Sequence, residues 1–344
     1  VGHVDDCFGA AASRECYLAF IKDFRYPLSS HGPLRFVLKI AVRIGVDGLV
    51  YLSQTNYIVE LAIKFGVIDA NPKHTPMEAG AVLSKAQQPA PDSAEWHEMQ
   101  KTPYRHLFGA LLYAGGNRPD IKGALAVLGR FLHNPGTTHW KSLKRVLVYL
   151  YTTRDRELCL GRGIKNSLLD SLTIFVDADH GGCQDTRRST SGVMVSLRGS
   201  TIDCISKRQG SVSNSTAASE LKAVQVACHK AMVLDFIFTE LGYDIKPIRI
   251  KTDSQVVVDM VARGFLKTNT KHLAVSFAEV LECVTNGLVT IVHVAGVNNT
   301  ADLLTKPLPR VTFEKHRDAL LNDIELGISD DSEARGNGRG GEAG

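Results

Sequence analysis

The sequence lacks several features that would place it in common classes of protein. Its seven cysteines are scattered and include no C-x-x-C pair, which argues against a zinc site or a disulfide framework and suits a reducing compartment. No apolar run is long enough to span a bilayer, so no membrane partner is expected. The paired Asp-Thr/Ser-Gly motif of an aspartic protease is also absent, which excludes that class.

The two ends of the chain lack other signals. The sequence opens on Val1 rather than Met, without the basic and then apolar order of a signal peptide, so we interpret it as a piece of something longer. Beyond Leu326 it is rich in Gly, Asp and Arg and has almost nothing to bury, which predicts disorder. With 344 residues, 44% of them hydrophobic, the chain can still bury a sizeable core divided among two or three units.

Basic residues gather in two places although the net charge is only +4. A solvated helix face and phosphate contact explain the first cluster equally well, and phosphate contact becomes the better reading only if a metal-binding acidic site exists. The first cluster comprises His139, Lys141, Lys144, Arg145, Arg154, Arg156, Arg162 and Lys165, and the second comprises Arg187, Arg188, Lys207 and Arg208.

Periodicity and turn residues predict the order of the elements. The first half reads as strands over 34–44 and 49–52, a helix over 56–65, a loop or linker over 71–103, and three helices within 104–154. The second half changes to three strands, a long amphipathic helix, a strand, helices, a strand and a last helix. Their predicted ranges are 172–176, 192–197, 201–206, 215–242, 248–252, a helix through 261, 271–284, 288–294, and a helix starting at 298–304. This alternation predicts an α/β fold.

Four acidic residues stand at strand ends or helix starts of the second half. Asp177 and Asp253 each close a predicted strand, Glu220 is expected in the first turn of the long helix, and Asp302 begins the last helix. Ligands of open sheets collect at strand ends. Carboxylates brought together repel one another unless a cation neutralises them, so their convergence predicts a divalent metal site suited to phosphodiester hydrolysis.

Other roles for these acids stay open at this point. Glu220 and Asp302 could serve only as partners of a helix dipole. Asp179 could take the place of Asp177 as the ligand, whereas Asp185 reads as a turn residue.

Two other chemistries have less support in the sequence than metal-assisted hydrolysis. His293, on the last strand, could act as a proton-transferring base, but a histidine on a strand is more often packed or exposed. A glycosidase with two carboxylates would need aromatic platforms for sugars, and Trp96 and Trp140 both lie outside the acidic segment.

The acidic segment resembles the ribonuclease H domain of copia-type retrotransposon Pol polyproteins. The stretches that carry this resemblance are Val176-Asp177-Ala178-Asp179, Arg187-Arg188-Ser189-Thr190-Ser191-Gly192, Ser206-Lys207-Arg208-Gln209, Ser219-Glu220-Leu221, Thr252-Asp253-Ser254-Gln255, Thr270-Lys271-His272 and Ala301-Asp302-Leu303-Leu304-Thr305-Lys306-Pro307-Leu308. Upstream stretches look like the second half of the matching reverse transcriptase: Val4-Asp5-Asp6, Leu52-Ser53-Gln54 with Tyr57, Thr75-Pro76-Met77, Tyr104-Arg105, Arg118-Pro119-Asp120 and His139-Trp140.

The resemblance implies a fold and a division of the chain. We expect a ribonuclease H-like mixed five-stranded sheet with flanking helices, preceded by a partial reverse-transcriptase palm and a helical thumb or connection region. The expected boundaries are 1–70 for the palm, 71–103 for a linker, 104–165 for the thumb or connection, 166–310 for ribonuclease H, and 311–344 for a last helix and tail.

The resemblance also implies a reaction, which is hydrolysis of the RNA strand of an RNA/DNA hybrid with two Mg²⁺ ions, or Mn²⁺ in their place. Its metal-binding acids fall on Asp177, Glu220, Asp253 and Asp302. Expected partners are the hybrid, the upstream reverse transcriptase or other Pol products, in a cytoplasmic particle or the nucleus. The expected substrate contacts are Arg187, Arg188, Ser189, Ser191, Lys207, Asn214, Gln255, Lys271 and His272.

The chain departs from the family pattern at several places, which suggests a diverged or decaying copy. Examples are His3 in place of a Tyr, His180 in place of a Trp, and Ser254 in place of an Asn; none removes a metal ligand. The alternative function is therefore a remnant that binds nucleic acid without cutting it. Asp5 and Asp6 match the paired catalytic acids of the palm, but polymerisation would need further acids and fingers from an upstream part.

Overall fold

The computed structural model describes residues 2–3, 6–7, 9, 11, 13–25, 32–46, 48–161, 172–266 and 273–321, with only the backbone at 2–3 and 6–7. The predictions made for Asp5, Arg162, Lys165, Lys271, His272 and the tail beyond Leu326 lie outside this part of the chain, as does the side chain of Asp6.

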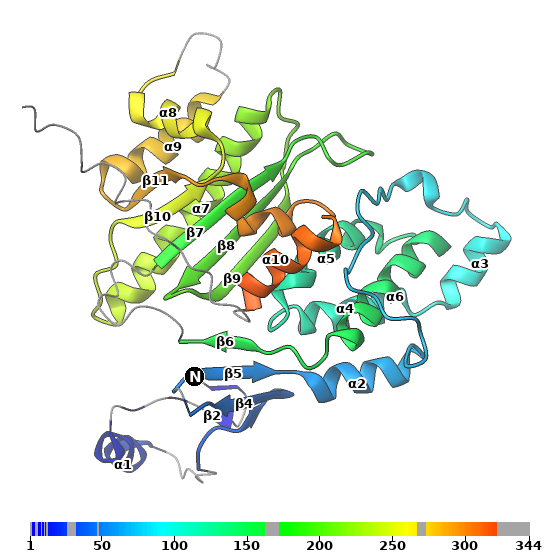
Figure 1. Ribbon diagram of the computed structural model, residues 1–344, viewed down its shortest axis with the longest axis horizontal. Helices are drawn as coiled ribbons and strands as arrows, with labels where there is room; N and C mark the ends of the chain where they lie inside the picture. Colours follow the sequence, from blue (N-terminus) through cyan, green and yellow to red (C-terminus); the bar gives the residue numbers. More distant parts are fainter. Residues whose placement is uncertain are drawn as a thin grey trace, which may run out of the picture.

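A five-stranded mixed sheet forms the centre of the molecule (Figure 1). Its strand order is β11-β10-β7-β8-β9, in which β7, β8 and β9 are antiparallel neighbours, while β10 runs parallel to both β7 and β11. The strands are β7 (Leu172–Asp179), β8 (Thr190–Leu197), β9 (Ser200–Arg208), β10 (Ile248–Thr252) and β11 (Val289–His293). This order and these directions confirm the predicted ribonuclease H-like sheet.

One face of the sheet is covered by a long helix. Ser215 caps α7 (Thr216–Glu240) by accepting a hydrogen bond from the Ala218 N–H, and α8 (Gln255–Arg263) and α9 (Ala274–Thr285) lie beside it. Because side chains alternate along a strand, Ile174, Val176, Val193 and Val195 pack into the core beneath α7. Asp177 is one position out of step with them and therefore points to the opposite face.

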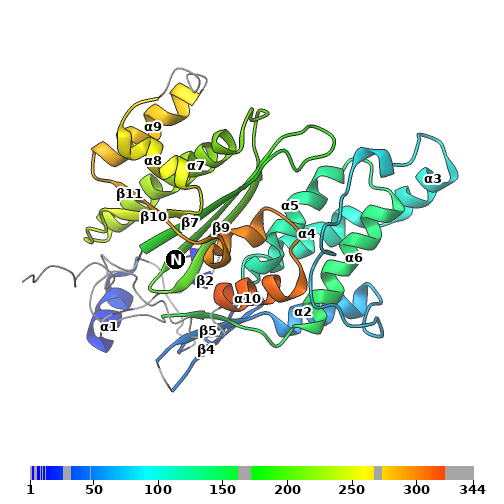
Figure 2. The ribbon, with the colours of Figure 1, turned by 45° about the horizontal axis from the view of Figure 1, so that its top comes forward.

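The opposite face is covered by elements from both halves of the chain. These are α4 (Tyr104–Ala114), η2 (Pro119–Ile121), α5 (Lys122–Leu128), η3 (Gly129–Phe131), α6 (Thr137–Thr152), η6 (Thr300–Leu304) and α10 (Arg310–Leu321). Met194 and Cys204 of the sheet share one hydrophobic core with buried residues of α4, α5 and α6. Figure 2 shows α10 lying between the sheet and these helices.

The expected last helix starting at 298–304 is corrected by the structure. Residues 296–298 and 300–304 form two 3₁₀ turns, η5 (Gly296–Asn298) and η6, and the last α-helix begins only at Arg310. Pro307 and Pro309 stand between them, and proline removes the N–H that a continuing helix would use.

A four-stranded antiparallel sheet, β3-β4-β5-β6, lies below the central sheet in the view of Figure 1. It consists of β3 (Phe36–Val37), β4 (Ile40–Ile44), β5 (Val50–Ser53) and the distant β6 (Leu158–Leu160). The single strand predicted over 34–44 was wrong, because Leu38 and Lys39 adopt positive φ and turn the chain between two strands. Helix α2 (Thr55–Lys64) follows, and β1 (Gly2–His3), β2 (Asp6–Cys7) and α1 (Arg14–Asp23) precede the sheet.

The segment 71–103 is more than a loop. It contains η1 (Lys85–Gln87) and α3 (Ala94–Lys101), and it buries Met77, Leu83 and Met99. No helix in the described part of the chain combines the length and apolar content needed to cross a bilayer.

Most described members of the first basic cluster make contacts within the protein. Arg145 pairs with Glu78 at 2.9 Å and Arg156 with Asp318 at 2.8 Å, while the buried His139 stacks on Phe131. The guanidinium of Arg154 lies over the ring of Tyr151. These contacts within the protein argue against phosphate binding by these four residues, and they also differ from the solvated helix face that was the alternative.

Candidate metal centre

Three of the four predicted acids converge at one edge of the central sheet. Asp177, Glu220 and Asp253 each offer a carboxylate oxygen, and these oxygens all lie within 4.8 Å of one another. They come from β7, α7 and the residue after β10, three elements far apart in the sequence.

Strand register explains how two of these acids meet. The parallel ladder of β10 and β7 ends with Thr252 beside Val176, so the next residues, Asp253 and Asp177, lie side by side. Asp177 does not close its strand as predicted, because β7 continues to Asp179 and pairs Asp177 with Gly192 of β8. The predicted place of Glu220 needs a correction, because it is the fifth residue of α7 and lies one turn deeper than expected. Its carboxylate accepts a hydrogen bond from the backbone of Ala178, which ties it to the end of β7.

The electrostatics of this cluster favour a bound cation. Burial, followed by the charges of Asp177 and Asp253, raises the pKa of Glu220 to about 9. Burial and the charge of Asp302 raise the pKa of Asp177 to about 7, against the opposing effects of Lys306 and Thr305. The folded chain therefore holds carboxyl groups whose charged forms lack enough positive charge nearby.

The donor set fits a hard divalent ion. Glu220 Oε2 is buried and has no hydrogen-bond partner among the described residues, so this oxygen can serve as a metal ligand. Carboxylate oxygens are the ligands that Mg²⁺ prefers, and Mg²⁺ sites commonly use only a few of them. Asp177, Glu220 and Asp253 could therefore hold such an ion.

Asp302 lies beside the cluster rather than within it. It occupies η6, and its Oδ1 pairs with Lys306 Nζ at 2.9 Å. Thr305 connects the two sites, since its hydroxyl donates to Asp177 Oδ2 and lies 3.0 Å from the Asp302 carbonyl oxygen. Burial favours the neutral form of Lys306, but the charges of Asp177 and Asp302 raise its pKa. The Lys306 ammonium therefore supplies positive charge beside these two carboxylates.

Sequence reasoning missed Asn299 as a residue of this site. The side chain is fully buried, and its Nδ2 donates to the Val176 carbonyl at 2.8 Å and lies 3.5 Å from Asp253 Oδ1. It thus ties the loop after β11 to β7 and to a predicted ligand. Asn299 also caps η6 by accepting a hydrogen bond from the Ala301 N–H, a local role that gives no signal of these long-range contacts.

The structure also shows where the other candidate residues of the sequence analysis lie. Asp179 lies outside the three-acid cluster, and burial raises its pKa. Asp185 is exposed and accepts a hydrogen bond from the Lys85 N–H at 2.8 Å, as a turn residue can. His293 is exposed at the end of β11, opposite Thr252 in the strand ladder.

The expected substrate contacts differ in accessibility. Ser189 and Ser191 are buried; Ser189 accepts from the Gly181 N–H and Ser191 from Gln209. Gln255 is exposed and donates to Asp259 at 2.7 Å. The remaining described candidates lie at the surface: Arg187, Lys207 and Asn214 are exposed, and Arg188 is half-buried.

A polar groove of about 310 Å³ lies over β8, β9, α7 and α9. Lys207, Arg208 and Lys222 give it positive charge, and Gln225 and Ser276 add hydrogen-bonding groups. Lys222 is held by hydrogen bonds of 3.0 and 3.1 Å from its Nζ to Ser211 and Ser213. Sequence analysis found Lys207 but not Lys222, whose position on α7 gives no sign of the groove.

Comparison with known proteins places the chain among transposon polyproteins. It is 33% identical over 291 residues to the retrovirus-related Pol polyprotein from transposon TNT 1-94 of Nicotiana tabacum, covering 84% of this chain and 22% of that protein. It is 32% identical over 292 residues to the corresponding polyprotein from transposon RE2 of Arabidopsis thaliana, covering 84% and 19%. The chain spans about a fifth of the length of these relatives.

Comparisons with family models and with solved structures give less information than the sequence relatives. No protein-family model matches. A solved structure, LC11 ribonuclease H1 isolated from compost, is 19% identical and covers 40% of this chain and 94% of its own, with a TM-score of 0.33. Strand order and direction, rather than this likeness, define the fold. From its sequence relatives, the chain belongs to the family of retrovirus-related Pol polyproteins of copia-type transposons.

Proposed function

We propose that this chain is a ribonuclease that hydrolyses the RNA strand of RNA/DNA hybrids with the help of divalent metal ions. The observation that carries the proposal is the convergence of Asp177, Glu220 and Asp253, with a buried Glu220 oxygen left without a partner. Membership of a Pol family on a ribonuclease H-like sheet supports this reading over other metal-assisted hydrolyses.

The proposed metal ligands are Asp177, Glu220 and Asp253, with Asp302 at the side. Two Mg²⁺ ions, or Mn²⁺ in their place, would supply a nucleophilic water at neutral pH and stabilise charge on the leaving oxygen. The residues of the chain prepare that chemistry. Asp177 and Glu220 must ionise to become ligands, so binding releases protons, and Thr305 holds the Asp177 carboxylate in place.

The polar groove is the proposed place for the nucleic-acid backbone. Lys207, Arg208 and Lys222 offer positive charge to phosphates, and the predicted contacts Arg187, Arg188 and Asn214 lie at the surface as such a role requires. Recognition of RNA would rest on its 2′-hydroxyl groups and on hybrid shape rather than on base sequence. Lys271 and His272 remain predicted contacts.

The first part of the chain is proposed as part of a reverse transcriptase. Residues 1–70 would be a partial palm, 71–103 a connecting segment, 104–165 the thumb or connection, 166–310 the ribonuclease, and 311–344 the last helix and tail. Asp5 and Asp6 would belong to a polymerase site that needs an upstream part of Pol to be complete.

The test is a cleavage assay on the full chain with a hybrid labelled first in the RNA and then in the DNA strand. We expect Mg²⁺-dependent cutting of the RNA strand alone, abolished by Asp253→Asn. The control is Asp244→Asn, which changes an exposed aspartate in the loop before β10 and should leave cutting intact.

Two results would contradict the proposal. Binding of the hybrid without metal-dependent cutting would instead support a decayed remnant that retains only its basic groove. Cutting that survives Asp253→Asn would place the chemistry elsewhere in the chain.

A further inference from the structure

The segment that carries Asp302, Thr305 and Lys306 is held against helix α5. A Cβ added at Gly123 would lie 2.5 Å from the Leu303 carbonyl oxygen and 3.2 Å from Leu304 Cα. Both atoms belong to backbone, so no side-chain rotation could relieve the overlap. Gly123 therefore allows an approach of α5 to η6 that no larger residue permits.

The other side of the same segment is packed equally closely. A Cβ at Gly192 of β8 would lie 2.7 Å from Thr305 Cγ2 and 2.9 Å from the Ala301 carbonyl oxygen. The segment is thus held between a helix of the N-terminal half and the central sheet. Its position is set by both, and a shift of either surface would move it.

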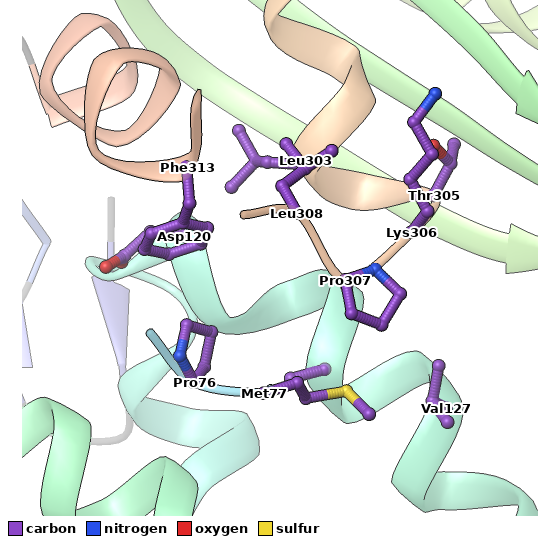
Figure 3. Close-up of a pocket in the computed structure, with 12 residues that line it drawn as sticks. Pro76, Met77, Asp120, Val127, Leu303, Thr305, Lys306, Pro307, Leu308 and Phe313 are labelled. Atoms are coloured by element: carbon purple, nitrogen blue, oxygen red, sulfur yellow. The ribbon is translucent and has the colours of Figure 1, made fainter. Parts of the chain in front are cut away.

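Neighbouring contacts fix the segment along its length (Figure 3). Met77 and Val127 come from the N-terminal half and line a small cavity of about 20 Å³ with Lys306, Pro307 and Leu308. The Gly80 N–H lies 3.4 Å from the Pro307 carbonyl oxygen. Figure 3 shows Lys306 leaving this packed region with its side chain directed away from Pro76 and Met77.

The position of this segment matters because it reaches the acidic cluster directly. Thr305 donates its hydroxyl hydrogen to Asp177, and Lys306 pairs with Asp302 at 2.9 Å. A displacement of η6 would therefore change both the orientation of a proposed ligand and the placement of the fourth acid. Outer contacts of this kind commonly change metal affinity by about 10- to 100-fold when they are lost.

We propose that Gly123 is a positioning residue for the metal centre, through which the helices of the N-terminal half set the geometry of the ribonuclease site. This inference rests on the proposed function for its biological meaning. Its physical content, that the contact between α5 and η6 controls metal affinity, does not depend on catalysis. The role of Gly123 and the proposed ribonuclease function can therefore be refuted separately.

The experiment compares Gly123→Ala with Gly109→Ala in the full chain. Gly109 lies in the neighbouring helix α4, where an added Cβ would meet nothing within 4 Å. Mn²⁺ alone is titrated into each protein by calorimetry, and thermal unfolding is followed without metal. We expect Mn²⁺ affinity to fall by about tenfold in Gly123→Ala and to stay unchanged in Gly109→Ala.

Hybrid cleavage measured on the same proteins separates the two proposals. If the unaltered chain does not cut, the proposed function fails, while the Mn²⁺ titration still decides the role of Gly123. A lower melting temperature with unchanged Mn²⁺ affinity in Gly123→Ala would overturn the inference, because the contact would then be structural only.

A second variant covers the case in which Gly123→Ala does not fold. Val127→Ala removes a half-buried side chain of α5 from beside Lys306 and Pro307 without creating an overlap. Lower Mn²⁺ affinity in this folded variant would support the inference. Unchanged affinity would overturn it.

Discussion

The buried carboxyl groups of Glu220 and Asp177 are expected to lower the stability of the metal-free protein as the pH rises, and Glu220→Gln should remove much of that contribution. His139 and His316 act in the opposite direction, because burial lowers the pKa of both side chains. The folded state raises the pKa of Glu220 from its ordinary 4.5 to about 9 and that of Asp177 from 3.8 to about 7. The folded chain thus keeps protons that the unfolded chain releases. Because the native state then binds more protons, the free energy of unfolding falls with pH across this window.

The size of the effect follows from the pKa of Glu220. For each proton that the folded state binds and the unfolded state does not, the free energy of unfolding falls by about 1.4 kcal/mol when the pH rises by one unit. Between about pH 5.5 and 7.5, Glu220 alone should therefore lower it by about 2–3 kcal/mol, and Asp177 should add a smaller amount as it nears its own pKa. Glutamine carries no proton to lose, so the Glu220 part disappears.

Urea unfolding in the presence of EDTA at both pH values measures this dependence. The control is Glu240→Gln, at the exposed end of the same helix α7, which should keep the dependence of the unaltered protein. Adding Mg²⁺ should also flatten it, because ions bound to ionised carboxylates stabilise the folded state. Equal pH dependence in Glu220→Gln and the unaltered protein would refute this reasoning.

Three further predictions test the surroundings of the site. Asn299→Ala removes buried hydrogen bonds to the Val176 carbonyl and toward Asp253, so it should cost about 1–3 kcal/mol of unfolding free energy in urea and also weaken Mn²⁺ binding in calorimetry. Arg118→Met leaves the fully buried Asp120 without its ion pair, now 2.7 Å long, and should cost about 3–5 kcal/mol in the same unfolding assay, part of which Asp120→Asn restores. Lys222→Ala should reduce the salt dependence of hybrid affinity by about one phosphate contact in a binding titration, while Lys230→Ala, on the same helix but paired with Asp203, should not.

The sheet could be predicted because its strands carry local signals. Alternating residues such as Val193 and Val195 mark a strand with one face in a core. Asp177 and Asp253 could be placed together because one lies near the end of β7 and the other directly follows β10. Glu220 was found for a similar reason, although its depth in the helix depended on where the cap falls. Capping by Ser215 puts it one turn further in.

Features that arise from long-range packing could not be predicted. Arg145 and Arg156 read as a basic surface, but their partners Glu78 and Asp318 lie far away in the sequence. The positive φ of Leu38 and Lys39 breaks a run that alternates correctly for one strand. Gly123 looks like any glycine in a helix, and only the neighbouring η6 backbone reveals why a side chain does not fit there.

The most direct test of the metal centre is a crystal of the full chain soaked in Mn²⁺, with anomalous scattering used to locate the ions. A peak bound directly to carboxylate oxygens of Asp177, Glu220 and Asp253 is the predicted result. Mn²⁺ bound elsewhere while these carboxylates stay free of metal would contradict the account.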